Sequence, residues 1–214
     1  MVAEYTSAAH THTLVGWLIE IGASPDLVRE GLRIVDDELV HAELSAEVLA
    51  LAGGGPVPPL PRAALRLPRA EPTEAAVLHW NVEIFCLGET VAVPLFRKML
   101  AGTTQPQARR LLRRIVADEA RHRDFGWTLL DSLLAGPWGE EARLRLGAGL
   151  PAALARIREA YSGGASTLPE GAREWGLLAP AAYGEVLRQV ERTWWRPRFA
   201  ARLAADGARA TLPG

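Results

Sequence analysis

Two short strings hold the side chains of this chain that are best placed to do chemistry. They read Asp37-Glu38-Leu39-Val40-His41 and Asp118-Glu119-Ala120-Arg121-His122. Positions i and i+3 lie side by side on a helix, so the glutamate and the histidine of one string can reach a single metal ion. Chance alone would give about 0.4 Glu-x-x-His matches in a chain of this composition. Two matches, each with a preceding aspartate, therefore indicate a metal site.

The surroundings of both strings support this interpretation over that of exposed Glu–His helix pairs. Ile34 and Ala42 flank the first string on its helix face, and Ile115 and Phe125 flank the second. Carboxylates without partners would be costly in such apolar surroundings. A bound metal would remove that cost.

Two further glutamates complete the ligand set that two such motifs usually have, one from each of two more helices. Glu4 and Glu89 are the candidates, because apolar residues continue the helix face of each. Glu20 lies at the far end of the first helix. Glu83 and Glu89 point about 120° apart on a regular helix, so Glu83 is expected to support the ligands or to act as an extra one.

Four glutamates and two neutral histidines would balance the charge of two divalent ions. Such oxygen and nitrogen ligands suit iron or manganese, so we expect two irons, with manganese or a mixed pair as the alternatives. Glu38 and Glu119 are expected to bridge the ions, and Glu4 and Glu89 to bind one each. Asp37 and Asp118 should each accept a hydrogen bond from the histidine of the opposite string, which fixes the tautomer of that ring.

The elements that must position these residues are helices. Abundant alanine and leucine favour an all-α fold, and turn signals divide the first 135 residues into four long segments. The segments are expected at Val2–Ile21, Pro25–Ala52, Thr73–Ala101 and Gln105–Leu134, with Ser24 and Thr73 as N-caps. Gly88 and Pro94 could open the third into a π-bulge.

These segments predict a four-helix bundle made of two helical hairpins. The proline-rich stretch 56–72 between the hairpins is long enough to cross one end of the bundle. Residues 136–214 should add two helices, at Glu140–Tyr161 and Pro180–Ala205, with a loop at 162–171 between them. Neither could bury a core alone, so we expect residues 136–214 to pack on the bundle of residues 1–135 within one domain.

Composition limits the partners of the chain. A net charge of −1 at pH 7 gives no overall field to attract nucleic acid or an anionic membrane. Cys86 is the single cysteine, which excludes an internal disulfide framework and a cysteine-ligated zinc or rubredoxin-type site. Neither a signal-peptide pattern nor a membrane-spanning apolar run is found, so a cytoplasmic protein is expected.

In the order Glu4, Glu38/His41, Glu89 and Glu119/His122, the chain resembles the ferritin-like non-haem di-iron carboxylate superfamily. Its strings Glu4-Tyr5-Thr6-Ser7 and Leu87-Gly88-Glu89-Thr90 are similar to those of bacterial ferritin-like domain proteins of this size. The resemblance covers residues 1–135. It implies a ferritin-like bundle whose metal centre reacts with dioxygen, with those six residues as ligands. It implies no particular substrate, because the superfamily includes ferroxidases, peroxidases, desaturases, hydroxylases, N-oxygenases and RNA hydroxylases.

The leading hypothesis is a di-iron oxidase or oxygenase that acts on a small molecule in a pocket next to the metals. Electrons would come from an external donor or from the substrate, and a monomer or homodimer is expected. The extra helices, which contain Tyr183, Trp194 and Trp195, could cover the open end of the bundle or simply pack on it. The residues expected to line the pocket are Thr11, Val82, Cys86, Phe125 and Gly126.

Two alternatives remain open. The first is a ferroxidase or iron-storage protein, which would assemble into a cage. The second is a di-iron hydroxylase acting on tRNA, suggested by a basic patch at the start of the fourth helix. We interpret that patch as a solvated helix face and do not expect nucleic acid binding. Its members are Arg109, Arg110, Arg113 and Arg114.

Overall fold

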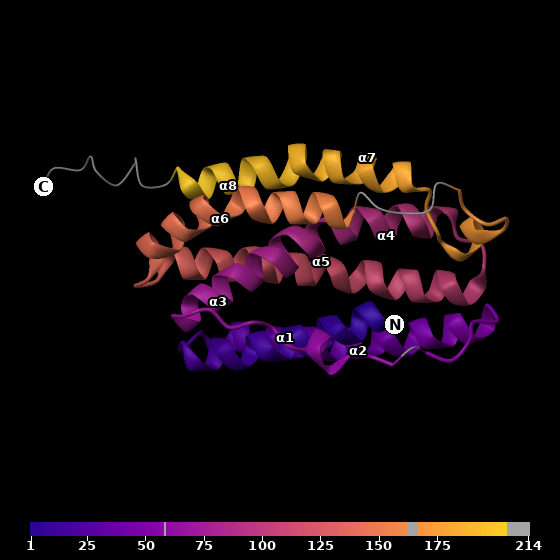
Figure 1. Cartoon of the computed structure of the whole chain (residues 1–214), viewed down its shortest axis with the longest axis horizontal. Helices are drawn as coiled ribbons and strands as arrows, with labels where there is room; N and C mark the ends of the chain where they lie inside the picture. The colour runs from indigo at the N-terminus through magenta and orange to yellow at the C-terminus, as the bar shows by residue number, and fades with distance from the viewer. Residues whose placement is uncertain (58, 162–166, 205–214) are drawn as a thin grey trace, which may run out of the picture.

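The computed structural model describes residues 1–57, 59–161 and 167–204, and in this part of the chain it contains helices and no strand. The all-α prediction is therefore confirmed. Four long helical segments lie along the long axis of the molecule (Figure 1). They are α1 (Val2–Glu20), α2 (Pro25–Leu51), the run of α3 (Thr73–Trp80), η2 (Asn81–Glu89) and α4 (Thr90–Gly102), and α5 (Pro106–Ala135).

The connection from α2 to α3 was expected to cross one end of the bundle. It runs back along α1 instead. It contains the short helix η1 (Arg62–Leu65), and His10 Nε2 lies 2.9 Å from the carbonyl oxygen of Ala64. Further along, Arg69 Nη1 donates to Glu20 Oε2 at 3.0 Å, at the end of α1. Because the connection returns to the end where α2 began, α2 and α3–α4 run in the same direction (Figure 1).

A π-helical segment interrupts the third long helix, as Gly88 and Pro94 suggested. It spans Asn81–Glu89 and contains the candidate ligand Glu89 at its last position. Here α5 approaches very closely, since a Cβ added to Gly126 would clash with Phe85. Asn81 Nδ2 donates to the Gly126 carbonyl at 3.0 Å. Such segments often mark functional sites.

The two predicted N-caps have different outcomes. Ser24 caps α2, with the Leu27 amide donating to its hydroxyl at 3.4 Å. Thr73 is not a cap, because it is already the first residue of α3. Its hydroxyl instead donates to Glu20 Oε1 at 2.8 Å, which ties the start of α3 to the end of α1.

The remaining helices cover α3, η2, α4 and α5 (Figure 1). They are α6 (Gly139–Ala160), η3 (Ala172–Trp175), α7 (Pro180–Val190), the π-helical η4 (Glu191–Trp195) and α8 (Arg196–Leu203). Trp195 is fully buried and its Nε1 donates to the Cys86 carbonyl at 3.1 Å. The guanidinium groups of Arg123 and Arg198 both lie over the ring of Trp194. These two tryptophans therefore serve packing.

Two expectations fall partly outside the described residues, namely the loop at 162–171, through its residues 162–166, and the helix Pro180–Ala205, through its last residue. No helix in the described part of the chain combines the length and hydropathy needed to cross a bilayer.

Candidate metal centre

The six predicted ligands come from four different helical segments and meet in the interior. We call Glu4, Glu38, His41, Glu89, Glu119 and His122 the carboxylate–histidine cluster. Ligand atoms of Glu4, Glu38 and His41 all lie within 4.8 Å of one another, and the same holds for Glu38, Glu119 and His122. Glu38 therefore belongs to both of these groups of possible metal ligands.

Both histidines present Nδ1 to the same two carboxylates. His41 Nδ1 lies 3.5 Å from Glu38 Oε2 and 4.0 Å from Glu119 Oε1. His122 Nδ1 lies 3.6 Å from Glu38 Oε1 and 3.5 Å from Glu119 Oε2. Glu38 and Glu119 thus lie between the two rings, where bridging carboxylates would be needed.

The other ring nitrogens face the two aspartates in the crossed pattern expected from the sequence. His41 Nε2 lies 3.0 Å from Asp118 Oδ2, and His122 Nε2 lies 3.3 Å from Asp37 Oδ2. An ionised carboxylate only accepts hydrogen bonds, so each Nε2 must be the donor. In the neutral rings, each Nδ1 then carries a lone pair directed into the cluster.

Several atoms of the cluster are buried without a hydrogen-bond partner. Buried polar atoms nearly always have one, so a convergent group of unpaired acceptors suggests that a cation belongs there. The nitrogen and oxygen donors fit divalent iron or manganese. The unpaired atoms are Glu38 Oε2, His41 Nδ1, Glu119 Oε2 and His122 Nδ1.

Electrostatics supports the same conclusion. Burial, reinforced by the neighbouring Glu38 carboxylate, raises the pKa of Glu4 to about 7. Burial, with the Glu38 charge adding to it, raises the pKa of Glu119 to about 8. Burial and the Glu119 charge raise the pKa of Glu89 well above its usual value. Without a cation these carboxyl groups retain protons near neutral pH, and bound dications would displace those protons.

Sequence analysis missed two arginines that join the aspartates. We call Arg114, Arg121, Asp37 and Asp118 the arginine–aspartate ring. Arg114 Nη2 donates to Asp37 Oδ1 at 2.9 Å, and its Nε donates to Asp118. Arg121 Nη2 donates to Asp37 and, at 3.3 Å, to Asp118 Oδ1. The spacing of Arg114 and Arg121 from Asp118, i−4 and i+3, was the signal that could have found them.

The arginine–aspartate ring keeps the Asp37 carboxylate ionised, so that it can only accept hydrogen bonds. Burial alone would raise the pKa of Asp37, but hydrogen bonds from His122 and Arg121 outweigh burial and hold the pKa well below its usual range. Arg114 is exposed, as the interpretation of a solvated helix face expected, but its guanidinium is paired with both aspartates. Arg109 is engaged as well, because it donates to the carbonyls of Leu100 and Thr103.

Two other residues near the cluster were also missed. Ser7 Oγ donates to Glu38 Oε1 at 2.8 Å, and its i+3 spacing from Glu4 places both on one face of α1. Tyr161, at the end of α6, is close enough that burial and the charges of Glu89 and Glu119 raise its pKa. No local pattern could have placed Tyr161 there, because its position depends on how α6 packs.

Glu83 faces away from the cluster, contrary to its expected supporting role. It accepts a hydrogen bond from Arg156 Nε at 3.1 Å and lines a cavity that contains no cluster residue. Helix geometry already directs Glu83 about 120° away from Glu89, and the partner that Glu83 meets there, Arg156, depends on how α6 packs.

The five residues expected to line one pocket do not do so. Val82 lines a cavity between α3 and α6, while Phe125 lines another between α2 and α5. Cys86 is fully buried, and its thiol lies 3.4 Å from the Gly126 carbonyl within the core. Gly126 packs against Phe85. Only Thr11, buried with an unpaired hydroxyl one turn beyond Ser7, continues the cluster-facing side of α1.

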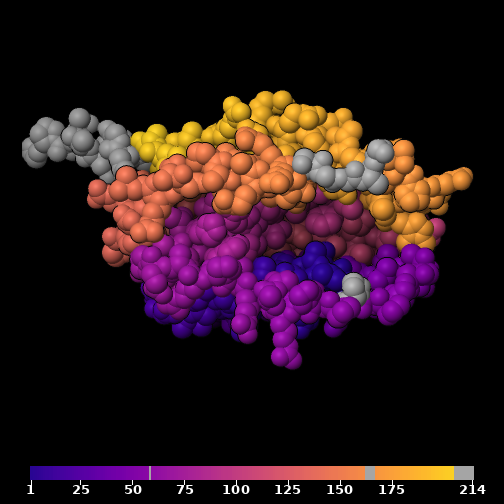
Figure 2. Space-filling view, in the orientation of Figure 1, coloured from indigo at the N-terminus to yellow at the C-terminus, as the bar shows by residue number. Residues whose placement is uncertain are grey.

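The face drawn in Figure 2 is hollowed between α6 and the connection from α2 to α3, and the indigo start of α1 is visible within this hollow. Glu4 lies in the first turn of α1 and is only partly buried. The hollow therefore exposes the start of α1, the element that holds Glu4.

Comparison of the chain with protein-family models, with curated proteins and with solved structures finds no match. The relationship to the ferritin-like superfamily rests on the motifs and their spacing, and it stays a prediction.

Proposed function

We propose that this protein is a ferritin-like di-iron oxidoreductase that uses dioxygen to oxidise a small molecule at the carboxylate–histidine cluster. One observation carries the proposal: the two inward-facing Nδ1 atoms and the unpaired oxygens of Glu38 and Glu119 converge on a common space. A helical bundle held together by packing alone has no need for such a group of buried, unpaired acceptors.

Each part of the cluster would have a distinct task. Glu4 and His41 would hold one ion and His122 the other, with Glu38 and Glu119 between them. Glu89, whose pKa responds to the charges of Glu119 and His122, would join His122 on the second ion. The aspartates hold both histidines in the tautomer that a metal needs, and the two arginines hold the aspartates. A bound ferrous pair would supply electrons for the reduction of dioxygen, and an external donor or the substrate would replace them.

The surroundings favour a small-molecule oxidase over a tRNA hydroxylase. The start of α1, which holds the partly buried Glu4, is visible in the hollow, and Tyr161 is near enough for the charges of Glu89 and Glu119 to raise its pKa. Two arginines of the basic patch that suggested tRNA are engaged within the protein instead. Manganese or a mixed pair would fit the same donors, so the metal is a matter for direct measurement.

Anaerobic loading with ferrous iron followed by rapid mixing with dioxygen tests the proposal. We expect two irons per chain, one for each group of ligands, and a transient visible absorption band that the Glu38→Ala variant lacks. No stoichiometric iron and no reaction with dioxygen would overturn the proposal. Uptake of many irons by a very large assembly would instead support the ferroxidase alternative.

A further inference from the structure

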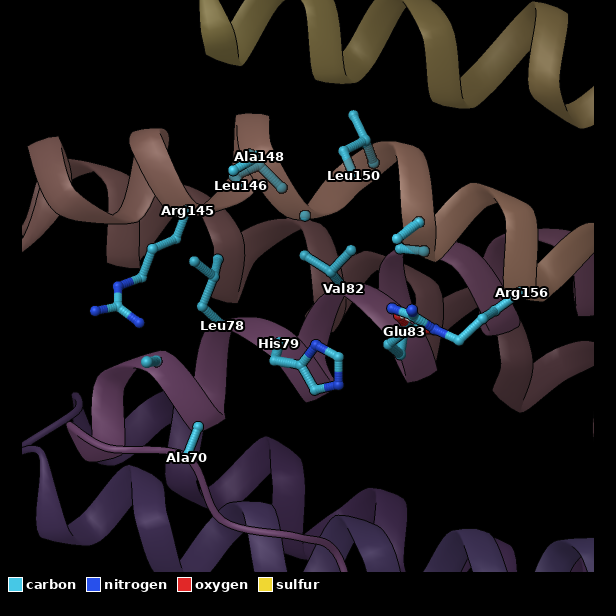
Figure 3. Close-up of a pocket in the computed structure, with 14 residues that line it drawn as sticks. Ala70, Leu78, His79, Val82, Glu83, Arg145, Leu146, Ala148, Leu150 and Arg156 are labelled. Atoms are coloured by element: carbon cyan, nitrogen blue, oxygen red, sulfur yellow. Dashed lines mark hydrogen bonds and ion pairs between the residues drawn. The ribbon is translucent and has the colours of Figure 1, made fainter.

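A second feature of the molecule is a cavity of about 490 Å³ between α3–η2 and α6, which we call the α3–α6 cavity. Its volume lies within the range of small-molecule sites, about 300–1,000 Å³. Leu78, Val82, Leu146 and Leu150 line it together with alanines and a glycine, and its charged residues lie toward its ends (Figure 3). No residue of the carboxylate–histidine cluster lines it.

The two arginines of this cavity differ in how firmly they are held. Arg156 is 53 % exposed, but both its Nε and its Nη2 donate to Glu83, whose side chain is only 16 % exposed. Arg145 pairs with Glu141 at 2.6 Å, but both of these side chains are 44 % exposed and the pair is an i,i+4 contact on one helix. Exposed pairs of this kind contribute little, so Arg145 can exchange Glu141 for a ligand carboxylate at small cost.

We propose that the α3–α6 cavity binds a small amphipathic carboxylate, with its head group on Arg145 and its aliphatic chain along Leu78 and Val82 toward Leu150. Arg145 and Arg156 lie three turns apart on α6, about 16 Å, which leaves room for a chain between them. The lining suits a flexible aliphatic body, because its one ring is that of His79. The firm Glu83–Arg156 pair closes the far end and offers no free charge to a second polar group.

The charge of the cavity also favours an anion. Arg145 and Arg156 against Glu83 give the lining residues one net positive charge when His79 is neutral, and Glu141, which lies outside the lining, balances it until a ligand carboxylate replaces Glu141 on Arg145. Burial lowers the pKa of His79, so this ring adds no second charge at neutral pH. An ammonium compound of the same length would meet the unfavourable sign of charge at Arg145.

Isothermal titration of the full chain with octanoate, octan-1-ol and octylammonium tests this inference. EDTA is included, so that a carboxylate cannot bind through metal and failure of the metal proposal cannot affect the result. We expect one octanoate per chain, bound at least about tenfold more tightly than octan-1-ol. Arg145→Gln should remove this preference, whereas Arg110→Gln, an exposed arginine on α5, should keep it. No octanoate binding, or equal affinity for all three compounds, would overturn the proposal.

A second variant tests the location. A Cβ added at Gly149, which lines the cavity, meets no atom within 4 Å, so Gly149→Phe can occupy the cavity without disturbing α6. It should reduce octanoate affinity by about tenfold or more, since the ring takes the space of the ligand. Gly16→Phe on α1 is the matched control, because Gly16 is equally open and lies elsewhere. Octanoate binding that survives in Gly149→Phe would place the site outside this cavity.

Discussion

The imidazole rings of His41 and His122 are held at one nitrogen and open at the other. Their Nε2 atoms donate to Asp118 and Asp37, while their Nδ1 atoms face Glu38 and Glu119 without a hydrogen-bond partner. A neutral histidine has one donor and one acceptor nitrogen, so fixing the donor also fixes the acceptor. The aspartates therefore determine that both acceptors point to the same space.

Removing a shared ligand should remove the metal. Glu38 belongs to both ligand groups, so Glu38→Ala should lose most of the bound metal, and His122→Ala should lose at least one ion per chain. Both should also lose the rise in melting temperature that metal gives to the parent protein. Metal analysis after gel filtration measures the first effect, with Glu43→Ala, an exposed glutamate on the same helix, as the control. Two metals per chain in either cluster variant would show that the site is wrong.

The arginine–aspartate ring should act through the histidines. Arg114→Gln or Arg121→Gln weakens the hold on both aspartates, so metal affinity should fall by about 10- to 100-fold, as is typical for partners of metal ligands. Competition with a chromophoric chelator measures this affinity, and the visible spectrum of the cobalt-loaded protein reports the ligand geometry. Arg110→Gln should leave both unchanged. Unaltered affinity and spectrum in both ring variants would assign the arginines to surface packing alone.

At the scale of elements, the π-helical segment η2 presents its two glutamates to different partners. Glu89, at its end, lies against Glu119, whereas Glu83 turns toward Arg156 on α6. The close approach of α5 to this segment depends on Gly126, where a side chain would collide with Phe85. Helix geometry and helix packing are therefore coupled at this point.

Gly126→Ala should test that coupling. The added methyl group has no room against Phe85, so the free energy of unfolding should fall by about 1–3 kcal/mol. Gly16→Ala, in an open position of α1, should instead raise it by about 0.5–1 kcal/mol, because alanine favours a helix. Urea unfolding of both variants gives the comparison. A neutral Gly126→Ala would show that α5 and η2 can separate without cost.

The variant Glu83→Gln tests whether the two glutamates of η2 have different roles. Because Glu83 pairs with Arg156 outside the cluster, the variant should keep two metals per chain and lose only a modest part of its stability, about 0.5–1 kcal/mol. Metal analysis beside Glu89→Gln, which should lose metal, provides the matched comparison. Equal metal loss in the two variants would make Glu83 a ligand.

Local spacing predicted some features well and could not predict others. The i,i+3 motifs placed Glu38 beside His41 and Glu119 beside His122, because helix geometry alone fixes those pairs. The same reasoning directed Glu83 away from Glu89 but could not supply its partner Arg156, and it failed for the pocket residues, because their surroundings depend on how whole helices pack. The positions of Tyr161 and Arg156 depend on how α6 packs, and no local sequence pattern predicts that packing.

At the scale of the whole molecule, the unfavourable charge of the cluster is concentrated in the interior while the total charge is −1. Three buried carboxyl groups, those of Glu38, Glu89 and Glu119, and the partly buried carboxyl group of Glu4 destabilise a metal-free fold whenever they ionise. The helices that surround them must therefore compensate, or a cation must be present.

The metal-free protein should lose stability as the pH rises. The pKa values of Glu4 and Glu119 are raised to about 7 and about 8 in the folded state, so between pH 5 and pH 8 the folded chain binds more protons than the unfolded chain. His41 and His122, whose pKa values are also raised, act in the same direction. The free energy of unfolding, measured with urea in EDTA, should fall across this range. A rise would show that the carboxyl groups are solvated and not clustered.

The claim that Glu38 and Glu119 join two metals is tested most directly by electron paramagnetic resonance of the iron-loaded, air-oxidised protein. If these carboxylates bridge two ferric ions, the coupled spins should leave the sample without a strong signal although analysis finds two irons per chain. An intense signal of isolated ferric ions that accounts for all the bound iron would contradict the shared site.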